Sequence, residues 1–348
     1  MSRLQEFQEL FCQIKNAWNN NEQTVLVILA DVKGSAYRLP GTKMLMTSSG
    51  LMAGNISGGC LEADLFEWAK KVFESNKPMN VCYDLSETEI WSLGIGCKGN
   101  LEFLFLPIDP KNPTWKIIDV LLAQEQPFTL IIDMEHGNIA VLEMEDTLAG
   151  EKNVPKAILE NAYLAFNRQT RAEIYTYNDE RFFIDVVKPS ERLVVAGAGK
   201  DAIPVVELAY KAGFSVTVLD ERSHFNNQQF FPNAKHVTID LENLIASELK
   251  DSWWVIMNHH QEKDEASLKY AIENRPRYIG VLGPKYRTNE MLENIGYTLN
   301  NAPIFSPVGL DIGAESIDEV AISIIAEIMS LRAGRIPQSL NGKEKIHV

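Results

Sequence analysis

The stretch 191–222, ERLVVAGAGKDAIPVVELAYKAGFSVTVLDER, decides the fold of the second part of the chain. An apolar run meets Gly197 and Gly199, a segment with helical periodicity follows, and a second apolar run ends at Asp220. This is the strand–helix–strand pattern of dinucleotide-binding folds, in which the first glycine permits a tight turn and the second admits a phosphate close to the backbone. The acidic residue typically accepts hydrogen bonds from ribose hydroxyls. We therefore predict an α/β protein with a Rossmann-like, doubly wound parallel sheet.

Length and charge limit the other possibilities. The chain has 348 residues, which predicts two domains. The formal net charge is −14 and no Lys/Arg cluster appears, so a nucleic-acid binder is not expected. No apolar stretch approaches the roughly 20 residues of a membrane span, and the N-terminus has an amphipathic helical pattern rather than a signal peptide. The four cysteines lack paired metal spacing, which favours reduced thiols in a cytoplasmic protein.

We expect an N-terminal α/β domain over 1–188 and the Rossmann-like domain over 191–348, joined by a short linker at 188–190. No segment of the sequence recurs, so no internal repeat is expected. A terminal helix is predicted near 317–332, with Ser316 and Glu319 as a capping box. Hydrophobic periodicity predicts the following N-terminal elements: helices at 4–18, 58–73, 115–124 and within 153–173, and strands at 24–32, 43–47, 51–54, 80–85, 100–107, 128–133, 139–144, 174–177 and 182–187.

Two glycine-rich segments of the N-terminal part are candidate sites. The arginine loop, 34–41, directly follows a predicted strand and suits an anion, because an Arg supplies a fork of donors and Gly backbone N–H groups can line a nest. The cysteine loop, 54–62, brings a thiol to the start of a predicted helix, where the helix dipole favours a thiolate. The candidate residues in these loops are Gly34, Ser35, Arg38, Gly41, Ser57, Gly58, Gly59, Cys60 and Glu62.

A third loop, 94–100, repeats this design with Gly96 and Cys97, and the adjacent lysine would also lower a thiol pKa. Taken singly, a glycine-rich loop is most often a turn and a cysteine is most often inert packing. Two loops with glycines around a thiol favour a functional interpretation. In the second domain, His259 follows an apolar strand at the edge where ligands bind in such sheets, although the His259-His260 pair fits a solvated loop equally well. Asp311 lies in a glycine-rich loop before the last helix.

In this order the motifs resemble those of the xanthine dehydrogenase accessory family, XdhC/CoxI. The resemblance runs from about residue 24 to residue 334 and is specific, because ordinary dehydrogenases have no such cysteine module before a Rossmann domain. It rests on these segments: GSAYRLPGTKMLM (34–46), GNISGGCLEADL (54–65), GIGCKGNLEFLFLP (94–107), VVAGAGKDAIPVVELA (194–209), VLDER (218–222), MNHHQEKD (257–264), YIGVLG (278–283) and PVGLDIGAESIDEVAISIIAEI (307–328).

The resemblance implies a chaperone rather than an enzyme. Members are thought to bind the molybdenum–molybdopterin cofactor, protect it while its terminal sulfido ligand is installed, and insert it into a xanthine dehydrogenase-type molybdenum hydroxylase. It implies Cys60 or Cys97 as a contact to molybdenum, and a phosphate site either at Arg38 or at the helix starts after Gly199 and Gly313. The implied partners are the apo hydroxylase and a cysteine desulfurase as sulfur donor, and a homodimer is compatible with this role.

Two other functions stay open on the residues alone. The Rossmann-like domain fits an NAD(P)-dependent oxidoreductase, for which Asp220 favours NAD over NADP, although no catalytic Lys, Tyr or His pair follows at the usual distances. The cysteine loop also fits a thiol-based sulfur carrier or scaffold that uses Cys60 without holding a cofactor.

Overall fold

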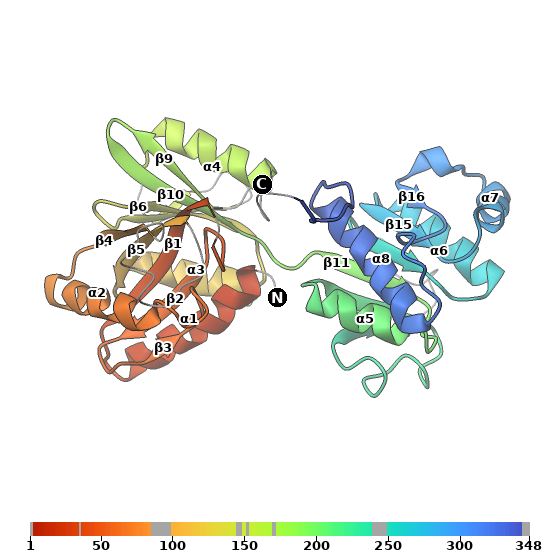
Figure 1. Ribbon diagram of the computed structural model, residues 1–348, viewed down its shortest axis with the longest axis horizontal. Helices are drawn as coiled ribbons and strands as arrows, with labels where there is room; N and C mark the ends of the chain where they lie inside the picture. The colour runs from red at the N-terminus through yellow and green to blue at the C-terminus, as the bar shows by residue number, and fades with distance from the viewer. Residues whose placement is uncertain are drawn as a thin grey trace. The chain divides into compact units, whose positions relative to one another are not determined.

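The computed structural model describes residues 3–34, 36–84, 99–143, 148–150, 153–168, 172–238 and 249–342. Contacts divide the chain into two compact units, one within 2–189 and the other within 190–339. Figure 1 shows that the first unit is built from curved sheets with helices, and the second from a single sheet covered by helices on both faces. In the part of the chain described, no helix is long and apolar enough to cross a membrane.

The first unit begins with a five-stranded antiparallel sheet in the order β3-β2-β1-β5-β4. One helix precedes its first strand and a second helix connects the third strand to the fourth. The elements are α1 (Arg3–Asn19), β1 (Thr24–Gly34), β2 (Lys43–Thr47), β3 (Met52–Ala53), α2 (Glu62–Ser75), β4 (Met79–Asp84) and β5 (Gly99–Ile108).

A second five-stranded antiparallel sheet follows in the order β8-β7-β6-β10-β9. Again one helix precedes the first strand and another connects the third to the fourth. The elements are α3 (Pro113–Ala123), β6 (Phe128–Asp133), β7 (Ile139–Leu142), β8 (Leu148–Gly150), α4 (Lys156–Arg168), β9 (Glu173–Tyr177) and β10 (Glu180–Val187).

The two sheets are therefore two copies of one topology, and the expectation of no internal repeat is wrong at the level of structure. Gly54 and Gly150 occupy equivalent positions: both have positive φ (+100° and +85°), and a Cβ on either would meet the first carbonyl oxygen of the second strand, at 2.9 Å from Lys43 and 2.6 Å from Ile139. The repeat escapes the sequence because hydrophobic alternation specifies which positions of a strand face the core without fixing residue identity.

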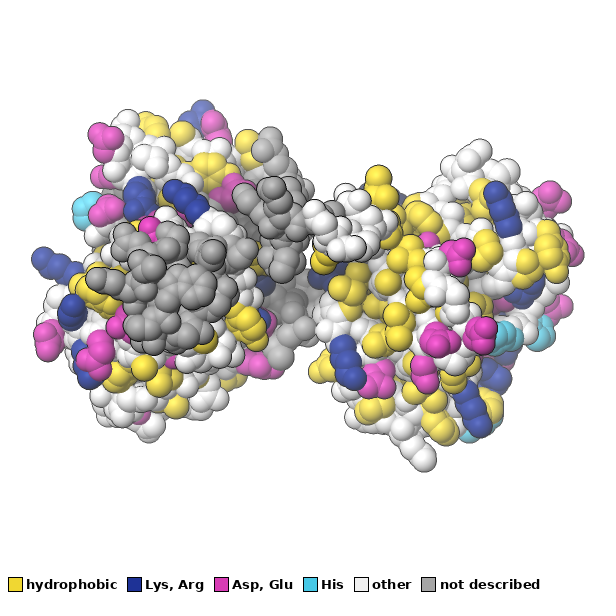
Figure 2. All heavy atoms as spheres, in the orientation of Figure 1, with side chains coloured by type: hydrophobic (Ala, Val, Ile, Leu, Met, Phe, Trp, Pro, Cys, Tyr) yellow, Lys and Arg dark blue, Asp and Glu magenta, His cyan; other side chains and the backbone are white. Residues whose placement is uncertain are grey.

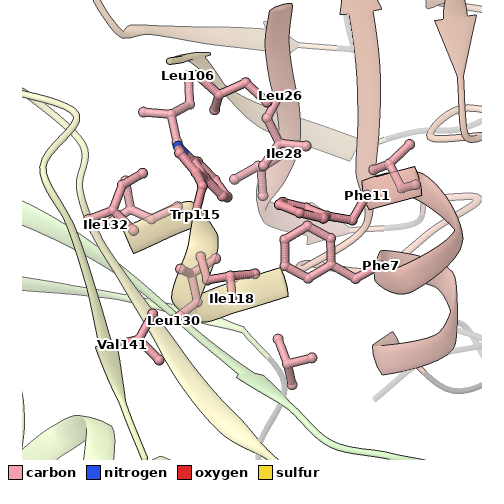
Figure 3. Close-up of a cluster of buried hydrophobic side chains, with 14 of the residues drawn as sticks. Phe7, Phe11, Leu26, Ile28, Leu106, Trp115, Ile118, Leu130, Ile132 and Val141 are labelled. Carbon is pink, nitrogen blue, oxygen red and sulfur yellow. The ribbon is translucent and has the colours of Figure 1, made fainter. Parts of the chain in front are cut away.

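The helices α1 and α3 share one hydrophobic core with both sheets, while α2 and α4 cover their other faces. Figure 3 shows Trp115 of α3 among side chains from both sheets, including Leu106 and Ile132. Trp115 is 1% exposed, so it links the two copies through packing. This shared core makes the first unit one body, and a change in one sheet is felt by the other.

The second unit has a six-stranded parallel sheet in the order β13-β12-β11-β14-β15-β16, the strand order of the Rossmann fold. This confirms the predicted fold class. The elements are β11 (Arg192–Ala196), α5 (Ala202–Lys211), β12 (Ser215–Leu219), β13 (Ala234–Val237), β14 (Trp253–Ile256), α6 (Gln261–Glu273), β15 (Tyr278–Val281), α7 (Lys285–Asn294), β16 (Ile304–Phe305) and α8 (Ile317–Arg332).

Alternate residues of β11 face opposite layers, as parallel strands buried on both sides require. Leu193 and Val195 pack with α5 and α8, whereas Val194 and Ala196 pack with α6 and α7. Apolar side chains also gather on the outer surface over α8 and α5 (Figure 2), where Ile322 and Met329 are each half exposed.

Local signals located most elements well. Helix α8 spans the predicted 317–332, and Ser316 and Glu319 form the predicted capping box. The helix expected from residue 58 instead begins at Glu62. Gly58 and Gly59 cause the delay, because their φ angles of +78° and +98° are incompatible with a right-handed helix. Cys60 consequently lies in the loop, two positions before the helix.

Candidate functional site

The arginine loop and the cysteine loop leave the same end of the first sheet. The arginine loop connects the end of β1 to the start of β2, and β2 and β3 are antiparallel. The end of β3 therefore lies beside the start of β2, where a Cβ on Gly54 would lie 2.9 Å from the carbonyl oxygen of Lys43. At the same end, Gly34 pairs with Gly99 at the start of β5. Ser35, Gly96 and Cys97 lie outside the described residues.

The second sheet shows that the fold does not need loops of this length. Its first two strands are joined by 134–138, whereas the first sheet uses 35–42. Its last two strands are joined by a two-residue turn, Asn178–Asp179, where both φ angles are positive. Long loops on a rigid scaffold are where binding residues concentrate, so the longer connections of the first sheet indicate function.

Buried charges beneath the arginine loop hold it in place. Asp185, on β10, is fully buried and forms ion pairs with Lys43 and with Arg3, the latter at 2.7 Å. The Lys43 ammonium also donates to the carbonyl of Gly41 at 3.0 Å. A Cβ on Gly41 would lie 2.8 Å from Nη1 of Arg3 and 3.1 Å from Oδ1 of Asp185, with φ at +94°. The positive φ therefore favours glycine at position 41, and a side chain there would displace the charged groups below it.

Arg38, the predicted anion-binding cation, is paired with Glu6 of α1 at 2.7 Å, and both side chains are about one-third exposed. A guanidinium has five N–H donors, and Glu6 accepts from one terminal nitrogen. Among the residues that the structure describes, no second acceptor contacts this guanidinium, so its remaining donors face the surface of the loop. The ion pair fixes where they lie.

Glu62 organises the cysteine loop from within. Its carboxylate accepts from the backbone N–H of Ser57 at 2.9 Å, from the Ser57 hydroxyl, and from the N–H of Leu61 at 3.2 Å. Asn55 accepts from the N–H of Gly58 at 2.9 Å. Burial raises the pKa of Glu62, but hydrogen bonds from the Ser57 side chain and from backbone N–H groups outweigh it, and the pKa lies below its ordinary value. Glu62 is thus an anion that shapes the loop.

These bonds leave Cys60 at the surface. Its side chain is exposed, and no heavy atom lies within 4 Å of a Cβ placed on the neighbouring Gly59. The two loops also touch, because three ring atoms of Tyr37 lie 3.4–3.6 Å from a Cβ placed on Gly58. The two loops therefore leave the same end of the first sheet and meet where Tyr37 lies against Gly58, and the exposed Cys60 follows two positions later.

In the second unit, the carboxylate of Asp201 lies against the second glycine of the predicted nucleotide-binding motif. A Cβ on Gly199 would lie 2.4 Å from Oδ1 of Asp201. The other oxygen of Asp201 contacts Nε2 of His259 at 2.7 Å. His259 lies at the carboxyl end of β14 with φ at +57°, a conformation that is uncommon for a non-glycine residue. A carboxylate thus covers the backbone that the second glycine of this motif normally opens to a pyrophosphate.

The predicted ribose acceptor is also engaged. Both oxygens of Asp220 accept from Arg222, at 2.9 Å from Nε and 2.6 Å from Nη2, and Oδ2 also accepts from the N–H of Ala198 at 2.8 Å. Burial raises the pKa of Asp220, but the hydrogen bonds from Arg222 and the backbone outweigh it, and the net pKa is lowered. A Cβ on Gly197 would lie 2.5 Å from the carbonyl oxygen of Met257, so this glycine serves the turn.

Asp311 is exposed in the loop that leads to α8, and among the described residues no polar contact ties it to His259 or Asp220. No three His, Cys, Asp or Glu side chains gather as a metal site in the part of the chain that the structure describes. The sequence reasoning missed Asp185, Asp201 and Arg222. Of these three residues, only Arg222 could have been suspected from the sequence, because it lies two positions after Asp220, the predicted ribose acceptor.

An antiparallel unit with a cysteine-bearing loop, followed by a Rossmann unit, defines the class of this protein. It belongs to the XdhC and CoxI family: a model described by that name matches residues 17–84, and one described as the XdhC Rossmann domain matches residues 193–328. This confirms the resemblance of the motifs.

Relatives extend over nearly the whole chain. A solved structure from Bacillus halodurans, described as a xanthine dehydrogenase, is 30% identical with a TM-score of 0.75, and the match covers 97% of this chain and 98% of that one. A protein of Bacillus subtilis, described as a probable subunit of xanthine dehydrogenase, is 29% identical over 90% of this chain and 94% of its own. The molybdenum cofactor insertion chaperone PaoD of Escherichia coli is 24% identical over 88% and 83%.

Proposed function

We propose that this chain binds the molybdenum cofactor at the cysteine loop, protects it during sulfuration, and inserts it into a xanthine dehydrogenase-type hydroxylase. The observation that carries the proposal is the exposed thiol of Cys60, held on the connection from β3 to α2, which spans 54–61 and is longer than the equivalent connection of the second sheet, 151–155. The similarity to an insertion chaperone over 88% of the chain supports an accessory role.

The residues at the cysteine loop fit this cofactor. Its molybdenum accepts soft ligands, and Cys60 offers a sulfur ligand at the surface. Its phosphate is an anion, and the guanidinium of Arg38 keeps donors beyond the one that Glu6 accepts from. When bound, the cofactor would supply the redox metal of the client enzyme, while this chain only holds and shields it. Glu62 keeps the loop in its bound shape, so little order has to be gained on binding.

Equilibrium binding of the isolated cofactor tests the proposal, with exposed cysteines as internal controls. We expect Cys60→Ser to weaken binding at least about tenfold, equivalent to ~1.4 kcal/mol. Cys12→Ser and Cys82→Ser should bind as the unchanged protein does, because these cysteines are also exposed but lie outside the loop. Equal binding by Cys60→Ser and the unchanged protein would refute the assignment.

The protective role requires a sulfur donor and a client. We expect a cysteine desulfurase to associate with the cofactor-loaded chain, and an apo hydroxylase to gain activity from it. A scavenger that captures released cofactor distinguishes two routes. If excess scavenger does not slow the transfer of cofactor from the loaded chain to the apo hydroxylase, direct insertion is supported. Loss of all transfer in the presence of the scavenger would mean that the cofactor is simply released.

A sulfur-carrier function is the second candidate, and the exposure of Cys60 favours it as well. In this case the Cys60 thiolate would attack the outer sulfur of a persulfide on the donor, whose own thiolate would leave. Mass spectrometry after incubation with a desulfurase and cysteine would detect one added sulfur on Cys60. Persulfide without cofactor binding would move this function to the front.

A further inference from the structure

Tyr37 is a large aromatic residue held at the surface between two fixed neighbours. Its side chain is 65% exposed. On one side, Ala36 packs against the hydrophobic core beneath α2. On the other side, Arg38 is tied to Glu6 of α1 by an ion pair of 2.7 Å. The backbone on both sides of Tyr37 is thus anchored, while the ring itself lies outside the core.

The ring lies flat against the cysteine loop. A Cβ placed on Gly58 would lie 3.4, 3.4 and 3.6 Å from Cδ1, Cε1 and Cγ of Tyr37. A point beyond the edge of the ring cannot be nearly equidistant from three consecutive ring atoms, so these distances place the Cβ position of Gly58 over the face. One face of the ring is therefore covered by backbone, and the 65% exposure comes from the rest of the ring.

From this placement we infer that the outward face of Tyr37 is a stacking platform for a planar conjugated heterocycle bound at the cysteine loop. Resting on the proposed function, that heterocycle is the pterin of the cofactor. Aromatic rings attract one another in offset stacks, and a tyrosine gives a rigid surface at low entropic cost because only two side-chain torsions have to be fixed. The thiol of Cys60, two positions after Gly58, would meet the metal end of the same ligand.

Glycine at position 58 serves this arrangement. Its N–H is bound by Asn55, and its φ of +78° is one that side-chain-bearing residues rarely adopt. A methyl group there would meet the covered face of the ring at 3.4 Å, which is an ordinary van der Waals contact. The positive φ, rather than crowding against the ring, therefore favours glycine at this position.

A metal-free pterin, 6-hydroxymethylpterin, tests the platform without the metal ligand. We expect ligand-observed NMR titration to show binding to the full chain that falls about tenfold in Tyr37→Ala, or ~1.4 kcal/mol. Tyr37→Phe should keep the affinity, because the ring is retained. The control is Tyr163→Ala on α4, which removes another half-exposed tyrosine of the same unit and should change nothing.

Equal affinity of Tyr37→Ala and the unchanged chain, or no pterin binding by the unchanged chain, would overturn the inference. Its failure is distinguishable from that of the proposed function. Pterin binding through Tyr37 without binding of the molybdenum cofactor would keep the platform and reject the function. Cofactor binding that is unaffected by Tyr37→Ala would do the reverse.

Discussion

The carboxylate of Asp185 and the ammonium of Lys43 form an ion pair that joins the two sheets of the first unit, although 142 positions separate them in the chain. The Asp185 side chain is fully buried and that of Lys43 is 5% exposed. Lys43 also lies 4.8 Å from the centre of the Phe7 ring. The floor of the arginine loop is therefore built from both copies of the repeat.

Replacing Asp185 by asparagine should strongly destabilise the first unit, because it leaves the buried ammonium of Lys43 without its counter-charge. We expect the free energy of unfolding to fall by about 3–5 kcal/mol. Urea denaturation followed by fluorescence measures this change. Asp119→Asn is the matched control, since Asp119 pairs with Lys15 at the surface and should cost at most ~1 kcal/mol. Similar losses in the two variants would contradict the role of burial.

Loss of the Glu62 charge should loosen the cysteine loop. The pKa of Glu62 is lowered in the folded chain, so its stabilising effect is present above the ordinary value of 4.5 and disappears as the pH falls through the folded pKa. At neutral pH we expect Glu62→Gln to cost ~1–2 kcal/mol, since Glu62 is partly exposed. As the pH falls from 4.5 to below the folded pKa of Glu62, the stabilities of the two proteins should converge. A difference that stays constant from neutral to acidic pH would argue against this source of stability.

Dinucleotides should not bind to the second unit. The Asp201 carboxylate lies where a pyrophosphate would approach Gly199, and Asp220 is already bound by Arg222. Calorimetry with NAD and NADP at millimolar concentration is expected to show no saturable heat. Asp201→Ala, which removes the blocking charge, is the variant in which weak binding should first appear. Stoichiometric NAD binding by the unchanged chain would instead revive the oxidoreductase function.

Two glycines of the second unit should respond very differently to alanine. Gly197→Ala would place a methyl group 2.5 Å from the carbonyl oxygen of Met257, with φ at +115°. Gly313→Ala faces open space and meets only the conformational cost of φ at +72°. We expect losses of at least ~3 kcal/mol for the first and ~1 kcal/mol for the second. Thermal unfolding compares them directly, and equal shifts in Tm would show that steric contact is not decisive.

The sequence predicted those elements of the fold whose formation depends on residues close together in the chain. Helix α8 was predicted with its capping box because Ser316 and Glu319 act within one turn. The Rossmann sheet was predicted because glycine and apolar runs recur at a fixed spacing. The predicted start of α2 was wrong by four residues. The positive φ angles of Gly58 and Gly59 end the helical pattern there, and hydrophobic periodicity does not reveal them.

The loops of the candidate site could be predicted from the sequence, but the ion pairs and hydrogen bonds that hold them in place could not. The exposed Cys60 and the arginine loop stood out as motifs, whereas the pairing of Lys43 with Asp185 arises only when distant strands meet. Similarly, the engagement of Asp220 by Arg222 depends on side-chain geometry that a motif does not encode. Long-range charge pairing is therefore where the structure adds most to the sequence.

The repeated topology means that the second sheet of the first unit can be compared directly with the first sheet. The second sheet closes the same strand order with 134–138 and with the turn Asn178–Asp179, so it is a working example of the scaffold without the long connections. Grafting those short connections onto the first sheet should yield a protein that keeps both sheets and their common core but lacks the arginine loop and the connection between β4 and β5, while the cysteine loop stays in place. The second sheet of the first unit is therefore a template for a variant that separates the contribution of the arginine loop from that of the cysteine loop.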